Sequence, residues 1–135
     1  MSALIFPASF EYLDEIRSHV AEKARAAGFV EKAVYAIQLA ADEAASNIIE
    51  HAYAGRTDGS FEMTCEFEQD RLIITFRDHG ISFDISKVSK PDLKADLSER
   101  KIGGLGIYLM HKLMDEVRYS STGSENTLTL TKRKE

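Results

Sequence analysis

The segment Ala41-Asp42-Glu43-Ala44-Ala45-Ser46-Asn47-Ile48-Ile49-Glu50-His51-Ala52-Tyr53 decides how this chain is interpreted. It forms the second half of a predicted helix over residues 30–53, whose apolar residues recur at helical spacing. That apolar face comprises Val30, Ala33, Val34, Ile37, Ala41, Ala44 and Ile48. Glu43, Asn47 and His51 lie four residues apart and form a polar row beside it. Such a row suits either a solvated helix flank or a cleft where a carboxylate orients a proton and an amide holds a metal.

Length and composition indicate one domain, residues 1–135, with a hydrophobic core of its own. The chain has no repeat, linker or low-complexity tract that would divide it. Its formal net charge is −5 and no run of Lys or Arg is long enough to follow a phosphate backbone, so we predict no direct binding of nucleic acid. Cys65 is the only cysteine, which excludes an intrachain disulfide and fits a reducing compartment.

The chain also lacks the signals of membrane insertion and export. No apolar run approaches the length of a bilayer span, and the N-terminus does not have the pattern of a signal peptide. We therefore predict a cytoplasmic protein without a membrane partner.

Two further helices are expected outside residues 30–53. Ser9 is a plausible N-cap for a helix whose apolar stripe is Leu13, Ile16, Val20 and Ala24, with Gly28 as its stop. The second is opened by Gly103-Gly104-Leu105-Gly106 and carries Leu105, Leu109 and Leu113 on one side. Uncovered backbone N–H groups at a glycine-rich helix start favour an anion there, although close packing alone also explains such glycines.

Alternation of apolar and polar residues predicts antiparallel strands. Residues 61–67 alternate with Phe61, Met63, Cys65 and Phe67 on one face, and residues 4–6 form a short edge strand ended by Pro7. Residues 117–121 and 128–130 form a hairpin around Gly123-Ser124. Between His79 and Ile102 the sequence has no strong periodicity, as expected for a lid loop or a disordered segment.

Asp78 has the same parity as Leu72, Ile74 and Phe76 in the strand that precedes it. If the strand keeps its register, a carboxylate points inward and needs a hydrogen-bond donor. No Lys or Arg is its obvious partner in the sequence, and a ligand with an exocyclic amine would serve. Alternatively, the strand ends at Arg77 and Asp78 starts a turn with Gly80, which this stretch alone favours.

The order of these three features resembles the Bergerat (GHKL) ATP-binding fold, and within it the single-domain anti-sigma-factor serine kinases of bacteria. Residues 42–53 match the family's N box, Asp78-His79-Gly80-Ile81-Ser82-Phe83-Asp84 its first glycine box, and residues 102–109 its second. Phe6-Pro7-Ala8-Ser9 resembles the family's opening. The resemblance covers nearly the whole chain; Ser82 departs from it where a proline is common, which should alter only the stiffness of the turn.

The resemblance implies an α+β fold, a two-layer α/β sandwich with a mostly antiparallel sheet covered on one face by about three helices. It implies ATP and Mg²⁺ as cofactors. Asn47 would bind the Mg²⁺ that bridges the phosphates, Glu43 would be the general base, and Asp78 would accept a hydrogen bond from the adenine amine. Gly80 would let the backbone approach the base.

Further site residues follow from the same resemblance. The helix start at Gly104, Leu105 and Gly106 would hold phosphate oxygens, and Arg100 or Lys101 could reach the γ-phosphate from the lid. The last candidates for the pocket wall are Thr129, Thr131 and His51, for which strand-face hydroxyls and a helix-edge imidazole are the simpler explanation.

The expected function is transfer of a phosphoryl group from ATP to a serine of a small STAS-type anti-anti-sigma protein. The unphosphorylated partner would compete with a sigma factor for this chain, which by resemblance is a homodimer. One alternative is an anti-sigma binding module that holds ATP without turnover. Another is a free-standing ATPase or histidine-kinase catalytic domain that acts on a separate phosphoacceptor.

Overall fold

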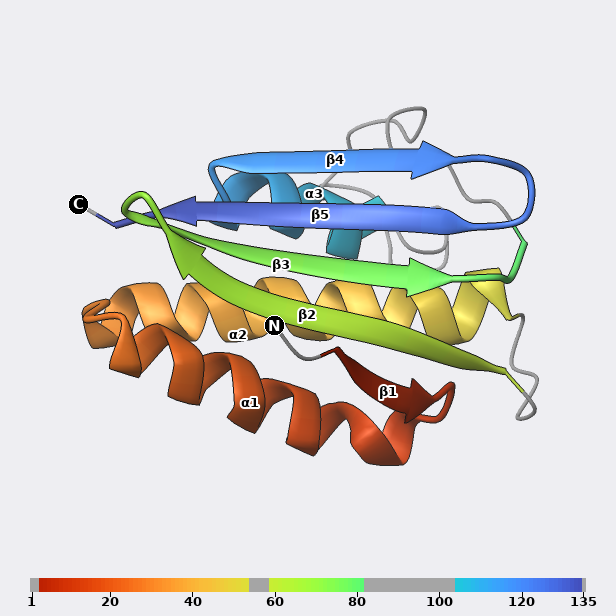
Figure 1. The fold of residues 1–135 in the computed structure, drawn as a ribbon, viewed down its shortest axis with the longest axis horizontal. Coiled ribbons are helices and arrows are strands. Elements are labelled where there is room, and N and C mark those ends of the chain that lie inside the picture. Colours follow the sequence, from red (N-terminus) through yellow and green to blue (C-terminus); the bar gives the residue numbers. More distant parts are fainter. Residues whose placement is uncertain (1–2, 54–58, 82–103, 135) are drawn as a thin grey trace.

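An antiparallel sheet of five strands forms one layer of the protein (Figure 1). The computed structural model describes residues 3–53, 59–81 and 104–134, and the statements below refer to these. The strands are β1 (Leu4–Pro7), β2 (Ser60–Glu68), β3 (Arg71–Asp78), β4 (Glu116–Ser121) and β5 (Asn126–Arg133). Their order across the sheet is β1-β2-β3-β5-β4, so the predicted edge strand and the predicted hairpin lie at opposite edges.

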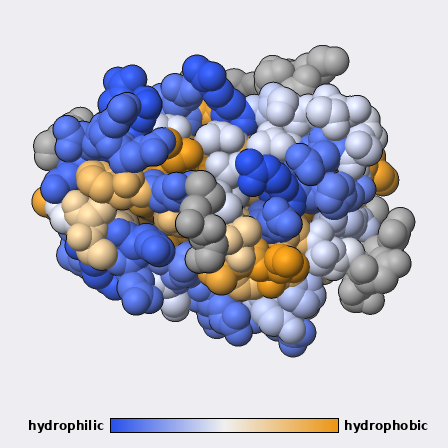
Figure 2. All heavy atoms as spheres, in the orientation of Figure 1, coloured by the Kyte–Doolittle hydropathy of each residue, from blue (hydrophilic) through white to orange (hydrophobic). Residues whose placement is uncertain are grey.

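The second layer consists of helices that all cover the same face of the sheet (Figure 1). They are α1 (Leu13–Ala26), α2 (Glu31–Asn47) and α3 (Gly104–Leu113), with a 3₁₀ turn η1 (Phe10–Tyr12) and a π-helical turn η2 (Ile48–Ala52). The opposite face of the sheet is turned toward the viewer in Figure 2 and is mostly hydrophilic. The predicted two-layer α+β sandwich is therefore confirmed. None of the described helices is long and apolar enough to cross a bilayer.

The core forms between the two layers, where alternate strand residues meet the helices. In β3 the residues Leu72, Ile74 and Phe76 are fully buried, as their parity predicts. Burying each such side chain contributes about 1.5–3 kcal/mol to folding. Phe67 departs from the predicted pattern of β2, because it lies near the end of the strand and remains 40% exposed.

Helix α2 lies between α1 and α3 and supplies the most buried helical face. Four of its six alanines, at positions 40, 41, 44 and 45, are fully buried, and such small side chains let neighbouring helices approach closely. The predicted apolar face begins too early, since Val30 is the N-cap residue and is 72% exposed. The helix also ends differently from the prediction, because its last turn widens into η2. In this wider turn the backbone N–H of Tyr53 donates to the backbone oxygen of Ile48, five residues earlier, at 3.1 Å.

The other predicted elements are present with small corrections. Gly28 ends α1 with φ +90°, whereas Ser9 occupies the N-cap position of η1 without a side-chain hydrogen bond. The hairpin turns at Gly123, with φ +93°. In α3 the fully buried positions include Ile107 and Met110, while the predicted stripe residues Leu109 and Leu113 are only half-buried.

Candidate functional site

The first turn of α3 packs directly against the polar row of α2. A Cβ atom added at Gly106 would overlap the Oε2 atom of Glu43 and would lie 3.7 Å from Asn47 Nδ2. A residue without a side chain therefore lets the glycine-opened helix approach the carboxylate and the amide together. The structure thus brings together Glu43, Asn47 and Gly106, which lie more than fifty residues apart in the sequence at their extremes.

Asn47 is held by its own helix. Its Nδ2 donates to the backbone oxygen of Glu43 at 2.9 Å, and the side chain is 9% exposed at the wall of a cavity. This bond uses the donor end of the amide and leaves the oxygen Oδ1 for another partner. An amide oxygen is a ligand that Mg²⁺ accepts, together with phosphate oxygens and water. The described residues contain no cluster of three or more His, Cys, Asp or Glu that would form a metal site of its own.

Glu43 is half-buried beside Gly106 and has other carboxylates near it. Burial raises the pKa of this carboxyl group, and the negative charges of Asp42 and Glu50 raise it further. Asp42 itself is ion-paired with Arg17, at 2.5 Å. A carboxylate with a raised pKa binds a proton more readily, which is the property that a general base needs.

Asp78 is the last residue of β3, and its carboxylate points inward. It is 5% exposed, so the alternative in which the strand ends at Arg77 is wrong. Its Oδ1 accepts hydrogen bonds from Asn126 Nδ2 at 2.8 Å and from Gly80 N at 2.9 Å. Among the described contacts both bonds end on Oδ1, which leaves Oδ2 as the acceptor for a ligand.

Asn126 is a site residue that the sequence analysis missed. It is 3% exposed and lies opposite Asp78 across the β3–β5 pair. Besides Asp78 it binds the backbone oxygen of Gly80 at 3.0 Å, so one amide holds the strand end and the following turn together. Its parity with Leu128, on the inward face of β5, was the sequence signal that could have found it.

Gly80 has a packing role that the sequence did not reveal. A Cβ atom at this position would overlap the backbone oxygen of Ala52, at the end of η2. The next residue, Ile81, donates its N–H to that same oxygen at 2.6 Å. The glycine therefore lets the chain after β3 pack against the end of η2, which fixes one side of the cavity.

Asn47 and Asp78 line the same cavity, which lies between α2, α3 and the sheet. Its walls also include Tyr119 and apolar residues such as Ile81, Met110 and Leu128, so the cavity is mostly apolar with a few polar groups. The cavity measures about 30 Å³. This is roughly the volume of one water molecule in the liquid. A purine therefore requires the walls to widen, and Ile81, which is 65% exposed, is the wall residue least confined by packing.

The structure does not bring every predicted residue to this cavity. Thr129 pairs with Thr75 on the opposite face of the sheet, where it neighbours Arg118 and Ser120, and this corrects its predicted place in the pocket. Thr131 has the same parity and lies on that face too. His51 lies in η2 and is half-buried, but it does not line the cavity.

Some predicted residues are outside the part of the chain that the structure describes. Arg100 and Lys101 of the predicted lid belong to this group, as does the stretch from Ser82 to Gly103. Gly104 and Leu105 are the first two residues of α3, so the predicted glycine-opened helix is present.

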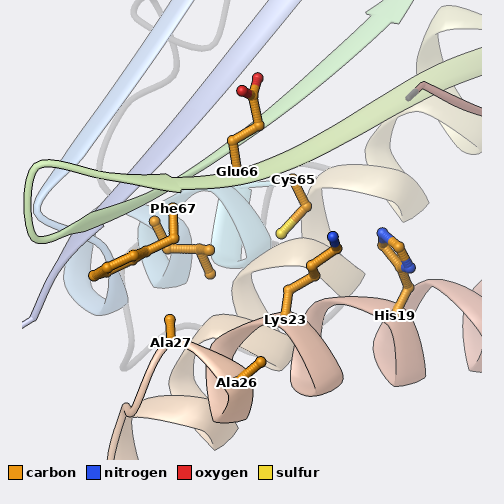
Figure 3. Close-up of a pocket in the computed structure, with 8 residues that line it drawn as sticks. His19, Lys23, Ala26, Ala27, Cys65, Glu66 and Phe67 are labelled. Carbon is orange, nitrogen blue, oxygen red and sulfur yellow. The ribbon is translucent and has the colours of Figure 1, made fainter. Parts of the chain in front are cut away.

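A larger cavity, of about 660 Å³, lies elsewhere between α1 and β2. Figure 3 shows His19 and Lys23 reaching from α1 toward Cys65 on β2. Burial raises the pKa of the Cys65 thiol to about 12, so the thiol stays protonated and unreactive at neutral pH. Burial and the charge of Lys23 lower the pKa of His19. This cavity lacks the amide and the strand-end carboxylate that mark the smaller one.

An amide on a helix, a carboxylate at a strand end and a glycine-opened helix around one cavity define an ATP-binding domain of the histidine-kinase type. In agreement, a family model described as "Histidine kinase-like ATPase domain" matches residues 6–132. The chain belongs to this family.

Its relatives specify the class of enzyme. The serine-protein kinase RsbW of Listeria monocytogenes serovar 1/2a is 33% identical over 119 residues, which are 85% of this chain and 76% of the relative. The serine-protein kinase RsbW of Bacillus pumilus is 35% identical over 133 residues, or 93% and 81% of the two chains. By this membership the chain is a serine-protein kinase, which confirms the predicted family and enzyme class.

Solved structures agree on the fold. The crystal structure of the RsbU and RsbW domains of Rv1364c from Mycobacterium tuberculosis superposes with a TM-score of 0.64 at 18% identity, over 99% of this chain and 33% of that chain. A histidine kinase domain from Erythrobacter litoralis EL346 superposes with a TM-score of 0.54 at 16% identity, over 95% and 61%.

Proposed function

We propose that this chain transfers the γ-phosphoryl group of ATP to a serine of a small STAS-type anti-anti-sigma protein and is itself an anti-sigma factor. The observation that carries the chemical part is the contact of Gly106 with Glu43 and Asn47, beside a cavity that Asn47 shares with Asp78. Phosphoryl transfer needs positioning and neutralisation of charge more than covalent help from the protein. These four residues would supply the positioning, while neutralisation would come from the Mg²⁺ held by Asn47 and from the start of α3.

The adenine end of the site is built around Asp78. Its Oδ2 would accept a hydrogen bond from the exocyclic amine of adenine, while Asn126 and Gly80 hold Oδ1 in place. Because the carboxylate is fixed by these donors before ATP arrives, little ordering remains to be done on binding.

The phosphate end is built around Asn47 and the start of α3. Asn47 Oδ1 would hold Mg²⁺, which when bound neutralises charge on the phosphates. The backbone N–H groups at Gly104, Leu105 and Gly106 would bind phosphate oxygens at the positive end of the helix dipole. Arg100 or Lys101 remains our proposed contact to the γ-phosphate.

Glu43 would act as the base. As the serine oxygen forms its bond to the γ-phosphorus, the hydroxyl proton passes to the Glu43 carboxylate, and the bond from the γ-phosphorus to the β–γ bridging oxygen breaks to release ADP. The raised pKa of Glu43 favours its acceptance of that proton.

The test of this proposal separates ATP binding from transfer. Glu43→Ala should bind Mg-ATP with the affinity of the unchanged protein and should put no label from γ-labelled ATP on a STAS-domain substrate. Equal labelling by Glu43→Ala would contradict the assigned base. If the unchanged protein binds ATP and the STAS domain but transfers no label, the chain is a binding module without turnover.

The remaining parts of the proposal concern assembly and location. We propose a homodimer that binds a sigma factor when the STAS partner is phosphorylated, in the cytoplasm where transcription takes place. Light scattering at several protein concentrations tests the dimer, and a monomer throughout would contradict it.

A further inference from the structure

A third cavity, of about 400 Å³, lies at the opposite end of α2 from the nucleotide site. Figure 1 shows that the start of α2, the end of α3 and the end of β5 meet at this end of the molecule. Its basic lining residues are Lys32, Lys112, Lys132, Arg133 and Lys134. These are five of the 17 Lys and Arg residues of a chain with net charge −5. The cavity is therefore a positively charged site on a protein that is negatively charged as a whole.

Three of the five cations of this basic pocket contact other parts of the fold. Lys132 Nζ donates to the backbone oxygen of Leu113 at 2.8 Å, and Lys112 Nζ lies 5.7 Å from the ring centre of Tyr108. Lys134 Nζ covers Gly28, where an added Cβ would lie only 2.7 Å from it. The start of α2 contributes further positive potential, since its N-cap residue Val30 makes no side-chain cap.

Acidic groups near the pocket do not cancel this charge. Glu31 is ion-paired with Arg25 at 3.0 Å. Asp115 accepts the backbone N–H of Arg133 at 2.6 Å and keeps its negative charge, so it offsets one of the five cations. The pocket therefore keeps an excess of positive charge.

The floor of the basic pocket is apolar. It includes Phe29, Ala33 and Leu113, with Val30 72% exposed at the rim. An apolar floor inside a basic rim matches a protein segment that carries an apolar side chain between carboxylates. A nucleic acid backbone would need a longer basic track and would leave the floor unused.

We propose that the basic pocket is a docking site for an acidic amphipathic segment of the protein substrate. This proposal rests on the proposed function only for the identity of that partner. Lys32 and Asn47 lie fifteen residues apart on α2. At 1.5 Å per residue the two sites are about 22 Å apart, too far for one nucleotide but within the span of a small protein domain. Docking here would hold the substrate without using any group that transfers phosphate.

The first experiment measures binding of a fluorescein-labelled twelve-residue peptide of Glu, Leu and Ala by anisotropy. The double charge reversal Lys32→Glu and Lys134→Glu should weaken binding about tenfold, and added salt should weaken binding to the unchanged protein. Lys132 is left in place because it closes α3. The matched control, Lys23→Glu with Arg118→Glu, changes the net charge equally but lies outside the pocket, and its affinity should not change.

Several results would overturn the docking site. One is that the matched control weakens peptide binding as much as the double charge reversal does. Others are that the unchanged protein does not bind the peptide, or that it binds a peptide with Gln in place of every Glu with the same affinity. Pocket-dependent binding of duplex DNA or of phosphatidylglycerol vesicles, without binding of the peptide, would also overturn it.

The second experiment links docking to catalysis and separates the two proposals. With a STAS-domain substrate, the double variant Lys32→Glu, Lys134→Glu should raise KM about tenfold and leave kcat unchanged. An unchanged KM would overturn the docking role. Asn47→Ala should still bind the peptide. Loss of transfer alone, with pocket-dependent peptide binding intact, would count against the proposed function and would leave the docking site supported.

Discussion

The two ends of the nucleotide site each contain a carboxylate, but the environments differ. Asp78 is 5% exposed and receives two hydrogen bonds, from Asn126 and Gly80. Glu43 is half-buried, and nearby negative charges add to the effect of burial in raising its pKa. The first environment fixes a carboxylate as an acceptor, and the second prepares one to take up a proton. Two residues of the same chemical type thus differ because of their surroundings, in the way that the proposed division into a recognition end and a catalytic end requires.

The glycines at the two ends differ in the same way. Gly80 lies against the backbone oxygen of Ala52, which cannot move without moving η2. Gly106 lies against the end of the flexible Glu43 side chain. A methyl group should therefore damage the fold at Gly80 and the chemistry at Gly106.

The largest expected effect is on catalysis at the Glu43 end. Glu43→Gln keeps the shape of the side chain but removes the base, and kcat for serine phosphorylation should fall by about 10²–10⁴. The measurement is transfer of label from ATP under single-turnover conditions. Asp42→Asn is the matched control at the adjacent position, and it should retain most of the activity. A Glu43→Gln rate within threefold of the original, on the order of 0.7 kcal/mol, would remove the contrast between the two carboxylates.

The next effect is on stability at the Asp78 end. Gly80→Ala should lower the free energy of unfolding by about 3 kcal/mol, because the overlap is with backbone that cannot relax. Urea unfolding followed by circular dichroism measures this. Gly106→Ala provides the comparison: it should change stability by about 1 kcal/mol or less, since Glu43 can rotate away and alanine favours the helix. The same substitution should slow transfer. Equal destabilisation by both would contradict the distinction between the two glycines.

A smaller effect is expected from the positioning residue Asn126. Asn126→Ala leaves Asp78 with one of its two donors, and stability should fall by about 1–3 kcal/mol. Affinity for ATP should fall while the rate of transfer at saturating ATP stays the same. Thr127→Ala, on the opposite face of the sheet, is the control and should change neither. A loss of kcat without a loss of affinity for ATP would contradict this assignment, because it would link Asn126 to the Glu43 end of the site.

The smallest effect is a pH dependence of stability. The folded-state pKa of Glu43 is raised, so the folded protein holds this proton more tightly than the unfolded chain does. Its stabilising contribution is present at acidic pH and is lost as the pH rises through the raised pKa. Glu43→Gln should therefore raise the melting temperature at pH 7, with a difference that disappears below about pH 4. A constant difference at all pH values would show that burial of the charge is not its cause.

Local pattern was sufficient to predict much of this molecule. The spacing of Glu43 and Asn47 placed them on one helix face, and the parity of Asp78 with Phe76 offered an inward carboxylate, although this stretch alone favoured a turn. Both inferences depend only on helix and strand periods. The exposed Val30 was misplaced because periodicity does not define where a helix begins.

The remaining features depend on contacts between distant segments. Asn126 reaches Asp78 through the register of β3 against β5, which the sequence of either strand alone does not specify. Gly80 meets Ala52 only because the end of α2 widens into η2. Thr129 was assigned by resemblance, against the parity that puts it on the far face of the sheet.

Calorimetric titration of Mg-ATP into Asn47→Ala tests most directly whether the amide and the strand-end carboxylate act on one nucleotide. The account predicts that binding falls below detection, while circular dichroism and urea unfolding show a folded protein. Affinity equal to that of the unchanged protein would contradict it, because the groups around the cavity would then not share a ligand.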